Sequence, residues 1–213
     1  AQTGCLDFED FPQGPVFGPL LGNSPGDTVF TQDGLQVAVQ EIHYVNGNTG
    51  FSNALVQGDN INWLDGQFLF MGNNAIELHY AESVQTVCFD FFDGGGEENV
   101  AVNGSPVAVL QQFTEVENLS IPGVEIELTL DSTSSGGFLS SGTVCFSGEI
   151  ESLLIGGQEF GVDNVCASAA EGSGGDCIEF EGMQPPGYGD GNTMPGAVFY
   201  EESGVNLRLA PFQ

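Results

Sequence analysis

The sequence CLDFEDFPQGPVFGPLLGNSPGDTVFTQDGLQVAVQ, residues 5–40, returns near the end of the chain as CIEFEGMQPPGYGDGNTMPGAVFYEESGVNLRLAPF, residues 177–212. Both stretches open with a cysteine, an apolar residue, an acid, a phenylalanine and a glutamate. Both then cross a loop rich in Pro and Gly to a Pro-Gly pair, which begins at Pro25 or Pro195. Deleting two residues from the loop aligns the copies, so the chain contains an internal repeat.

Each copy continues from a later glycine, Gly34 or Gly204, into a run with an apolar residue at every second position. Successive side chains of a strand point to opposite faces, so this period predicts a strand with one apolar face. The apolar positions are Leu35, Val37 and Val39 in the first copy and Val205, Leu207 and Leu209 in the second. Each copy therefore predicts a hairpin whose apolar face needs a partner.

The repeat predicts the domain organisation. Residues 1–166 form one β-domain, which closes at the sequence Asp-Asn-Val-Cys, residues 163–166. Residues 167–176, ASAAEGSGGD, have the small-residue composition of a flexible linker. Residues 177–213 repeat residues 5–40 without the rest of a domain. We expect this orphan hairpin to be donated to a neighbouring subunit, because its own domain already has the equivalent strands.

The charge balance excludes several classes of partner. The chain has 30 acidic residues and one basic residue, Arg208, which gives a formal net charge of −29. Nucleic-acid binding requires Lys and Arg, so it is excluded, and binding to anionic membrane surfaces is disfavoured. The balance favours cations, either as bound calcium or as a salty medium that screens self-repulsion. Adaptation to high salt is the competing interpretation.

Cysteine content and hydropathy indicate the cellular setting. No apolar run approaches the 18 residues that predict a membrane-spanning helix. Five cysteines in a glycine-rich acidic chain indicate an oxidising, extracellular environment. The start at Ala-Gln-Thr predicts a secreted protein whose signal peptide has been removed.

Four cysteines of the first domain allow three disulfide pairings. Cys5 opens the unit and Cys166 closes it, which predicts a bond between the first and last strands. Cys88 and Cys145 each lie in the sequence Val-Cys-Phe, which predicts a bond between two inner strands. Cys177 is the copy of Cys5, and its partner is left open.

Strand patterns with a two-residue period occur along most of the chain, separated by turns rich in Gly, Asn and Asp. The predicted strands are 6–10, 28–32, 35–45, 67–71, 75–80, 86–92, 99–103, 106–113, 124–131, 142–146, 149–155 and 159–165. Asn103 and Gly104 predict a tight hairpin turn. Together these patterns predict an all-β protein, a two-sheet antiparallel sandwich like a jelly roll with a C-terminal β-hairpin extension.

Three sequences carry a resemblance to known proteins. They are Cys-x-Asp-Phe-Glu from Cys5, Cys-Phe-Asp-Phe-x-Asp-Gly-Gly-Gly from Cys88, and Gly-Gly-Gln-Glu-Phe-Gly-Val-Asp-Asn-Val-Cys ending at Cys166. Residues 5–166 resemble secreted bacterial β-sandwich repeats of unassigned function. They are also similar, more loosely, to the calcium-stabilised jelly rolls of carbohydrate-binding modules.

The second resemblance implies a structural calcium ion between the terminal strands. Its ligands would be Glu9 and Asp163, with Asp7 or Asp27. The tail keeps Glu181 at the position of Glu9 but has alanine at the position of Asp27, which weakens the case for Asp27. The alternative is that these are solvated acids at strand ends.

Other polar and aromatic residues give weaker predictions. The acidic stretch 90–99 surrounds three glycines and is interpreted as an acidic turn. Trp63, among Asn and Asp residues, is the best candidate for a platform that stacks on sugars, whereas core packing is expected for Tyr44, Tyr80 and Phe51. Neither histidine, at positions 43 and 79, has a nucleophile pattern near it. No pair of carboxylates is singled out, so we expect no enzymatic activity.

Two functions remain. The first is a secreted structural subunit that self-assembles head to tail into an extracellular filament, with calcium as its cofactor and itself as its partner. The tail residues expected at the polymer interface are Phe180, Val198, Tyr200, Val205, Leu207 and Leu209. The alternative is a carbohydrate-binding or adhesive module of a longer multi-repeat surface protein, with polysaccharide as the partner. Both exclude nucleic acid and membrane insertion.

Overall fold

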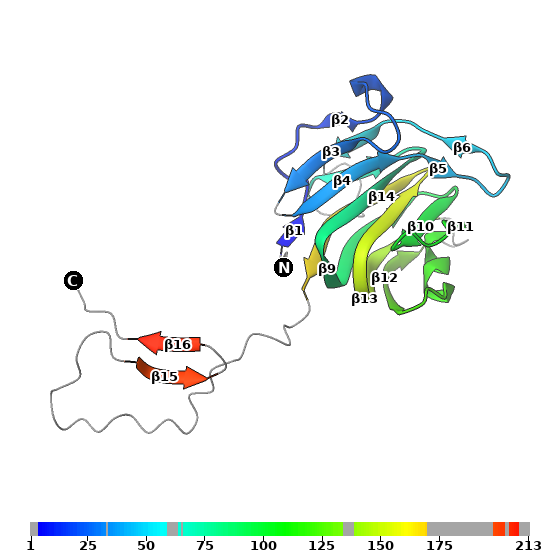
Figure 1. Cartoon of the computed structure of the whole chain (residues 1–213). Helices are drawn as coiled ribbons and strands as arrows, with labels where there is room; N and C mark the ends of the chain where they lie inside the picture. The colour runs from blue at the N-terminus through cyan, green and yellow to red at the C-terminus, as the bar shows by residue number, and fades with distance from the viewer. Residues whose placement is uncertain are drawn as a thin grey trace. The chain divides into compact units, whose positions relative to one another are not determined.

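The computed structural model describes residues 4–32, 34–58, 64, 66–133, 139–169, 198–202 and 205–208. The chain divides into two compact units, Ala1–Ala170 and Glu171–Gln213. Regular structure in the described residues is β-strand, apart from two short 3-10 helices, η1 (Pro19–Leu21) and η2 (Phe113–Asn118) (Figure 1). No helix among these residues is long and apolar enough to cross a membrane.

Twelve strands of the first unit form one large antiparallel sheet. Its main path runs in the order β11 (Ala108–Leu110), β10 (Glu98–Val102), β13 (Ser140–Gly157), β9 (Asn74–Asp93), β14 (Phe160–Ser168), β8 (Phe68–Met71), β7 (Ala54–Gln57) and β2 (Gly14–Phe17). Off this path, β1 (Gly4–Leu6) pairs with β14, β12 (Val124–Thr133) with β13, and β4 (Leu35–Gln40) with both β9 and β3 (Thr28–Gln32). A small second sheet joins β5 (Ile42–His43) to β6 (Thr49–Gly50).

Two long neighbouring strands, β9 with 20 residues and β13 with 18, lie within the curled sheet (Figure 1). The first part of β9 pairs with β4, and its second part pairs with β14. Register shifts interrupt the β9–β13 pairing between Ser147 and Ser152, and such bulges bend a strand. Both parts of the sheet contribute to one apolar cluster, which includes Ile76 from the first part of β9 and Phe89 from the second.

Aromatic rings fill the centre of this core. The ring centroid of Phe113 lies 4.6 Å from that of Phe91 and 4.7 Å from that of Phe160. These rings come from η2, β9 and β14, and all three side chains are fully buried. The η2 helix therefore belongs to the core that holds the curled sheet together.

The structure confirms most predicted strands and corrects several boundaries. Strand 28–32 is observed as predicted. The predicted pair 75–80 and 86–92 is one strand, and so is the pair 142–146 and 149–155, because bulges let the pairing continue through the polar residues between them. Strand 6–10 is wrong after Leu6, since Phe8 takes a φ of 57°. Residues 106–113 form only the short β11, after which the chain enters η2.

Asn103 and Gly104 form the predicted tight turn between β10 and β11. Their φ angles are 52° and 66°, and the N–H of Ser105 donates to the carbonyl of Val102 at 2.9 Å. Two successive residues with positive φ are typical of a type I′ hairpin turn.

Both predicted disulfides of the first unit are present, Cys5–Cys166 and Cys88–Cys145. The register also places Cys166 opposite Cys88, so the four cysteines form one row across β1, β14, β9 and β13. The two bonds therefore connect four neighbouring strands. These disulfides favour an oxidising, extracellular environment. Cys177 lies outside the described residues.

Candidate functional site

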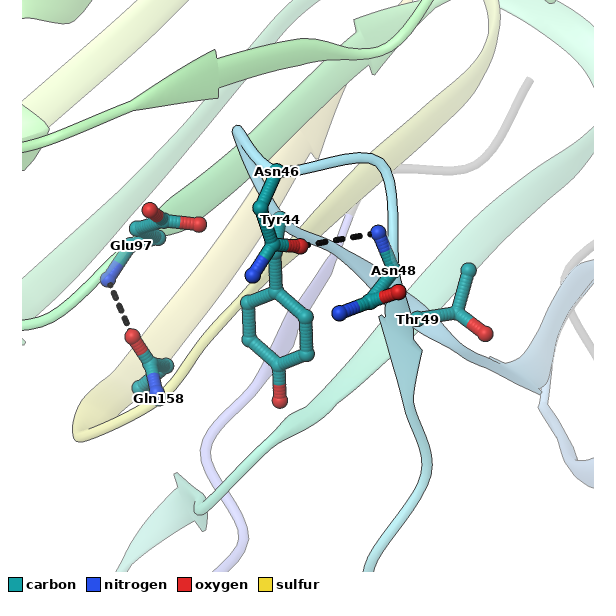
Figure 2. A pocket seen from close by; sticks show the side chains of 6 residues that line it. All are labelled: Tyr44, Asn46, Asn48, Thr49, Glu97 and Gln158. Carbon is teal, nitrogen blue, oxygen red and sulfur yellow. Dashed lines mark hydrogen bonds between the residues drawn. The ribbon is translucent and has the colours of Figure 1, made fainter.

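The first candidate site is an open pocket of about 670 Å³ next to the small sheet (Figure 2). It is lined by six polar residues, Tyr44, Asn46, Asn48, Thr49, Glu97 and Gln158. The N–H of Glu97 donates to Oε1 of Gln158 at 3.0 Å, and the N–H of Asn48 donates to Oδ1 of Asn46 at 2.9 Å. Amides, hydroxyls and one carboxylate could bind a neutral polar ligand by hydrogen bonds.

The loop that carries most of this pocket is held by the start of β10. The side chain of Asn99 accepts from the N–H of His43 at 2.6 Å and donates to the same residue's carbonyl at 2.8 Å. Glu97 accepts from the N–H of Val45 at 2.8 Å. Burial, and then the negative charge of Glu97, raises the pKa of Tyr44, whose hydroxyl donates to Oδ1 of Asn73 at 2.8 Å. The pocket therefore has a built, hydrogen-bonded wall.

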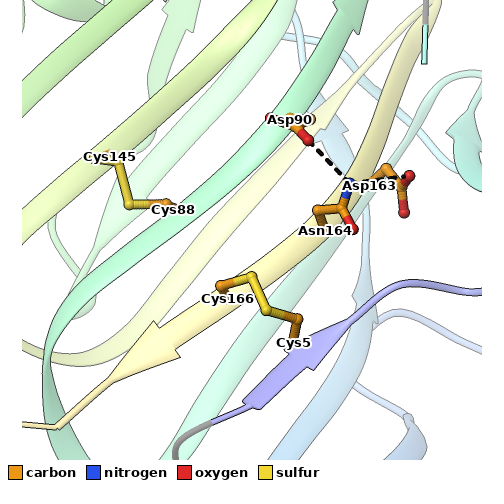
Figure 3. The surroundings of a disulfide bond; sticks show 7 residues. All are labelled: Cys5, Cys88, Asp90, Cys145, Asp163, Asn164 and Cys166. Atoms are coloured by element: carbon orange, nitrogen blue, oxygen red, sulfur yellow. Dashed lines mark hydrogen bonds between the residues drawn. A yellow bond between two sulfur atoms is a disulfide. The ribbon is translucent and has the colours of Figure 1, made fainter. Parts of the chain in front are cut away.

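The second candidate site is a group of carboxyls near the Cys5–Cys166 disulfide (Figure 3). Asp163 is only 2% exposed, and its Oδ1 has no hydrogen-bond partner among the described residues. Burial raises the pKa of Asp163 to about 7, and the negative charges of Asp90, Glu9 and Asp7 add to the effect. Two of the other predicted calcium ligands, Glu9 and Asp7, thus lie close enough to Asp163 for their charges to act on it.

The backbone positions this group. Asn164 takes a φ of 49° within the bulge between β14 and β9, and its Nδ2 donates to Oδ2 of Asp90 at 3.0 Å. Oε1 of Glu9 accepts from the N–H of Gln67 at 2.8 Å. Asp27 is not among the charges that act on Asp163, and it accepts from the N–H of Ser24 in the turn before β3. No group of three or more His, Cys, Asp or Glu with metal-binding geometry is found in the described part of the chain.

A buried carboxyl pair lies where β9 turns into β10, within the predicted acidic turn. Asp93 and Glu98 are both fully buried. Asp93 accepts from the N–H groups of Gly95 and Phe113, each at 2.8 Å. Neither Glu98 oxygen has a partner of good hydrogen-bond geometry among the described residues, although Asp93 is close enough for the two carboxyls to interact. Burial, and then the charge of Asp93, raises the pKa of Glu98 to about 9.

Burial also raises the pKa of Asp93, but the two backbone N–H groups stabilise its carboxylate and lower the pKa again. Glu98 has no such backbone donors in the part of the chain that the structure describes, so it is the member of the pair that holds a proton more readily. Sequence reasoning missed that Glu98 is buried. The signal was present, because Glu98 shares the two-residue period of the core residues Val100 and Val102. An acidic residue at a position where the two-residue period predicts an apolar side chain is easily taken for the last residue of a turn.

The third candidate is the tail hairpin, β15 (Val198–Glu202) and β16 (Val205–Arg208). Its register pairs are Val198 with Arg208, 200 with 207, 201 with 206, and 202 with 205. Adding 170 to both residue numbers of each pair in the β3–β4 hairpin gives these pairs. The β3–β4 pairs run from Thr28 with Ala38 to Gln32 with Leu35. The register shift also falls at the same place in both hairpins. The repeated sequence therefore forms the same local structure twice.

The first hairpin shows how such a unit is stabilised. Leu35, Val37 and Val39 of β4 are 4%, 1% and 0% exposed. They are covered because β4 pairs with residues 75–80 of β9 and packs onto the shared core. Among the predicted interface residues, Val198, Tyr200, Val205 and Leu207 lie on β15 and β16, whereas Phe180 and Leu209 lie outside the described residues.

The remaining predicted residues differ in their burial and in their contacts. Trp63 lies outside the described residues. Tyr80 is 8% exposed, its hydroxyl is buried without a partner among the described residues, and burial raises its pKa. Phe51 packs against the core, as predicted. Nε2 of His79 lies 3.3 Å from Oε2 of Glu77.

No protein-family model, no curated protein and no solved structure matches this chain.

Proposed function

We propose that this protein is a structural subunit that assembles by donating its C-terminal hairpin to the sheet of another copy. The shared register of β15–β16 and β3–β4 is the observation that carries the proposal. In the first unit the hairpin is held by β9. A two-stranded hairpin alone is marginally stable in water, so the tail needs an equivalent partner, and every copy of the chain contains one.

Head-to-tail donation is a heterologous contact, which yields a filament when the rotation between subunits does not close. The two disulfides favour an extracellular place for this assembly, and we propose that the protein is secreted. With a net charge of −29, copies repel one another unless salt screens them. Assembly is therefore expected near 0.15 M salt and weakened at low ionic strength.

We also propose that the curled sheet is a two-sheet sandwich of the jelly-roll kind, as in the secreted repeats that the sequence resembles. The core shared by both parts of the sheet supports this topology, and so does the pairing of the first strand, β1, with the last strand of the unit, β14. A solved structure of residues 1–170 tests it.

A calcium ion between these terminal strands is part of the proposal. The buried Oδ1 of Asp163, which has no partner in the described part of the chain, supports it, because calcium binds carboxylate oxygens and a buried carboxylate requires compensation. Glu9 and Asp7 would complete the protein ligands, with water and backbone oxygens for the rest. A bound cation would supply charge neutralisation and hold β1 against β14.

The assembly proposal is tested by comparing the full chain with a chain that stops at Ala170. Both are studied at 0.15 M salt by light scattering after gel filtration and by electron microscopy. The full chain is expected to form filaments, and the shortened chain is expected to stay monomeric with unchanged circular dichroism. Filaments of the shortened chain would contradict strand donation, and so would a full chain that stays monomeric.

The pocket favours a second candidate function, binding of a neutral polysaccharide. Its amides and hydroxyls match the hydrogen-bonding groups of sugars, and the acidic chain disfavours anionic ligands. Calorimetric titration with neutral oligosaccharides tests it, with Asn46→Ala and Gln158→Ala expected to weaken binding. The control Glu127→Gln changes an exposed residue of β12 and is expected to bind as the native chain does.

A further inference from the structure

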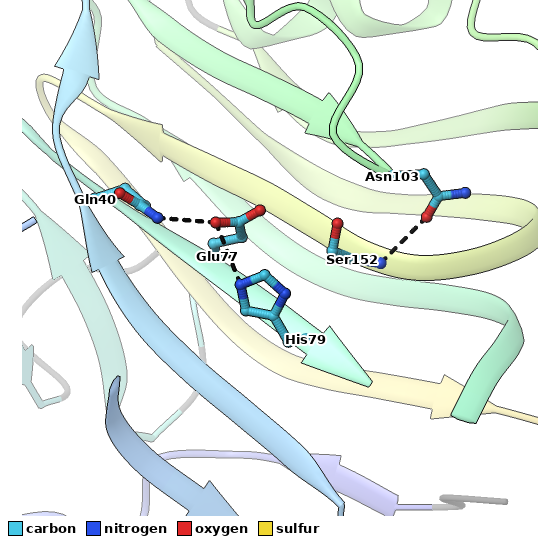
Figure 4. Close-up of polar contacts among 5 residues, drawn as sticks. All are labelled: Gln40, Glu77, His79, Asn103 and Ser152. Carbon is cyan, nitrogen blue, oxygen red and sulfur yellow. Dashed lines mark hydrogen bonds and ion pairs between the residues drawn. The ribbon is translucent and has the colours of Figure 1, made fainter. Parts of the chain in front are cut away.

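The face of β4 that carries its polar side chains is organised around Glu77 of β9 (Figure 4). Ala38 lies directly opposite Glu77 in the register. Nε2 of Gln40 donates to Oε2 of Glu77 at 2.8 Å, and His79 lies on the other side of the same oxygen. The first hairpin therefore provides Glu77 with a neutral hydrogen-bond donor, the amide of Gln40, which lies two residues along β4 from the position opposite Glu77.

The tail changes both of these positions at once. Adding 170 to each number places Arg208 at the position of Ala38 and Ala210 at the position of Gln40. At these two positions the tail therefore has arginine in place of alanine and alanine in place of the amide donor. Arg208 is the only Lys or Arg in the chain, so its position is the single place where the protein carries a fixed positive charge.

We infer that the tail hairpin docks on residues 75–80 of β9 in a second copy, in the place of that copy's β3–β4 hairpin, with Arg208 opposite Glu77. This inference rests on the proposed function and names its acceptor. Opposite charges directly across two strands attract, and Arg can bind a carboxylate with two hydrogen bonds. The pair gives the tail a contact that the resident hairpin lacks.

Docking of this kind replaces the apolar contacts of β4 with apolar contacts of the tail. The apolar residues of β4 that leave the core, Leu35 and Val37, have Val205 and Leu207 as their replacements. The tail gains the apolar cover that the displaced β3–β4 hairpin loses, so the total of apolar contacts changes little. The charge at Arg208 then decides which of two similar hairpins occupies β9.

The inference is tested by reversing the charges in the full chain. Arg208→Glu and Glu77→Arg are each expected to weaken association roughly tenfold, because each places like charges opposite one another. The double variant restores the pair in opposite order and is expected to recover most of the association. Glu127→Arg makes the same charge change as Glu77→Arg at an exposed site on β12 and is the matched control. Analytical ultracentrifugation measures all four variants.

A second test locks the resident hairpin in place. Gln36 and His79 lie opposite one another, so replacing both with cysteine can cross-link β4 to β9, as verified by mass spectrometry. The cross-linked chain is expected not to assemble, whereas either single cysteine variant assembles. If the locked chain or Arg208→Glu assembles normally while the chain ending at Ala170 does not, the tail docks elsewhere and this inference is wrong. Assembly of the chain ending at Ala170 contradicts the proposed function as well.

Discussion

The hairpins β3–β4 and β15–β16 have the same register and the same bulge, but only the first has a described strand partner beyond itself. In the first unit, β9 and the core cover the apolar residues of β4. The turn residues and the alternating apolar residues therefore suffice for pairing within the hairpin. We expect the stability of the hairpin to depend on a third strand that covers its apolar face. The following predictions separate these two contributions.

The largest effect is expected from placing a charge at matched positions of the two hairpins. Val37→Asp buries an unpaired carboxylate in the core and is expected to destabilise the first unit by at least about 4 kcal/mol. Leu207→Asp, at the equivalent tail position, is expected to leave the Tm of the first unit unchanged and to abolish assembly. Calorimetry measures the Tm and light scattering measures assembly. An equal loss of Tm in both variants would contradict the expectation that only the first hairpin stabilises the first unit.

The cysteines that begin the two copies give the next largest contrast. Cys5→Ser removes a bond between residues 161 apart in sequence, which is expected to destabilise the domain by about 4–5 kcal/mol in the chain-entropy account. Cys177→Ser is expected to leave the free energy of unfolding unchanged. Denaturant titration of both variants checks this, and peptide mapping that joined Cys5 to Cys88 would overturn the pairing.

The pH dependence of stability is expected to belong to the first unit alone. The pKa of Glu98 is raised to about 9 from an ordinary 4.5, so the folded state binds an extra proton between these values. Stability from this group is complete below pH 4.5 and is lost as the pH rises to about 9. Asp93, Glu115 and Glu97 are the charges that act on it.

Glu98→Gln keeps the shape of the protonated acid, so it is expected to raise the Tm at pH 9 and to change it little at pH 4.5. An increase of about 2–4 °C corresponds to 1 kcal/mol for a domain of this size. The control Glu127→Gln lies on the exposed face of β12 and is expected to follow the native curve. In chains that end at Ala170, thermal scans are expected to show the same difference in Tm between Glu98→Gln and the native residue at pH 9. If that difference disappeared, the group that titrates would lie in the tail.

The smallest effect is expected from calcium. A chelator at low salt is expected to lower the Tm by several degrees, because a ligand at about 100 times its Kd stabilises the folded state by about 2.7 kcal/mol. Glu9→Ala and Asp163→Ala are expected to remove this response. The tail counterpart Glu181→Ala and the exposed Asp131→Ala are expected to keep it. Equal responses in all four variants would mean diffuse charge screening without a site.

Local patterns carried the predictions that were confirmed. The strand 28–32 and the turn at Asn103 were predictable because alternation and turn chemistry depend on neighbours in the chain. The disulfide pairs followed from the strands that carry them. The continuity of β9 and β13 was not predictable, since a bulge keeps two strands paired through residues that break the alternation.

The repeat and the all-β class follow from the order of residue types along the chain. The order of residue types favoured the observed disulfide pairs, and the strand register shows them. The three-dimensional fold is needed to see that Glu98 is buried and that Ala38 faces Glu77. The same holds for the Asp163 oxygen that has no hydrogen-bond partner among the described residues. These facts arise from pairings between residues far apart in the chain. Burial and register are properties of the partner strand, and an alternating pattern specifies that a face is apolar without specifying what covers it.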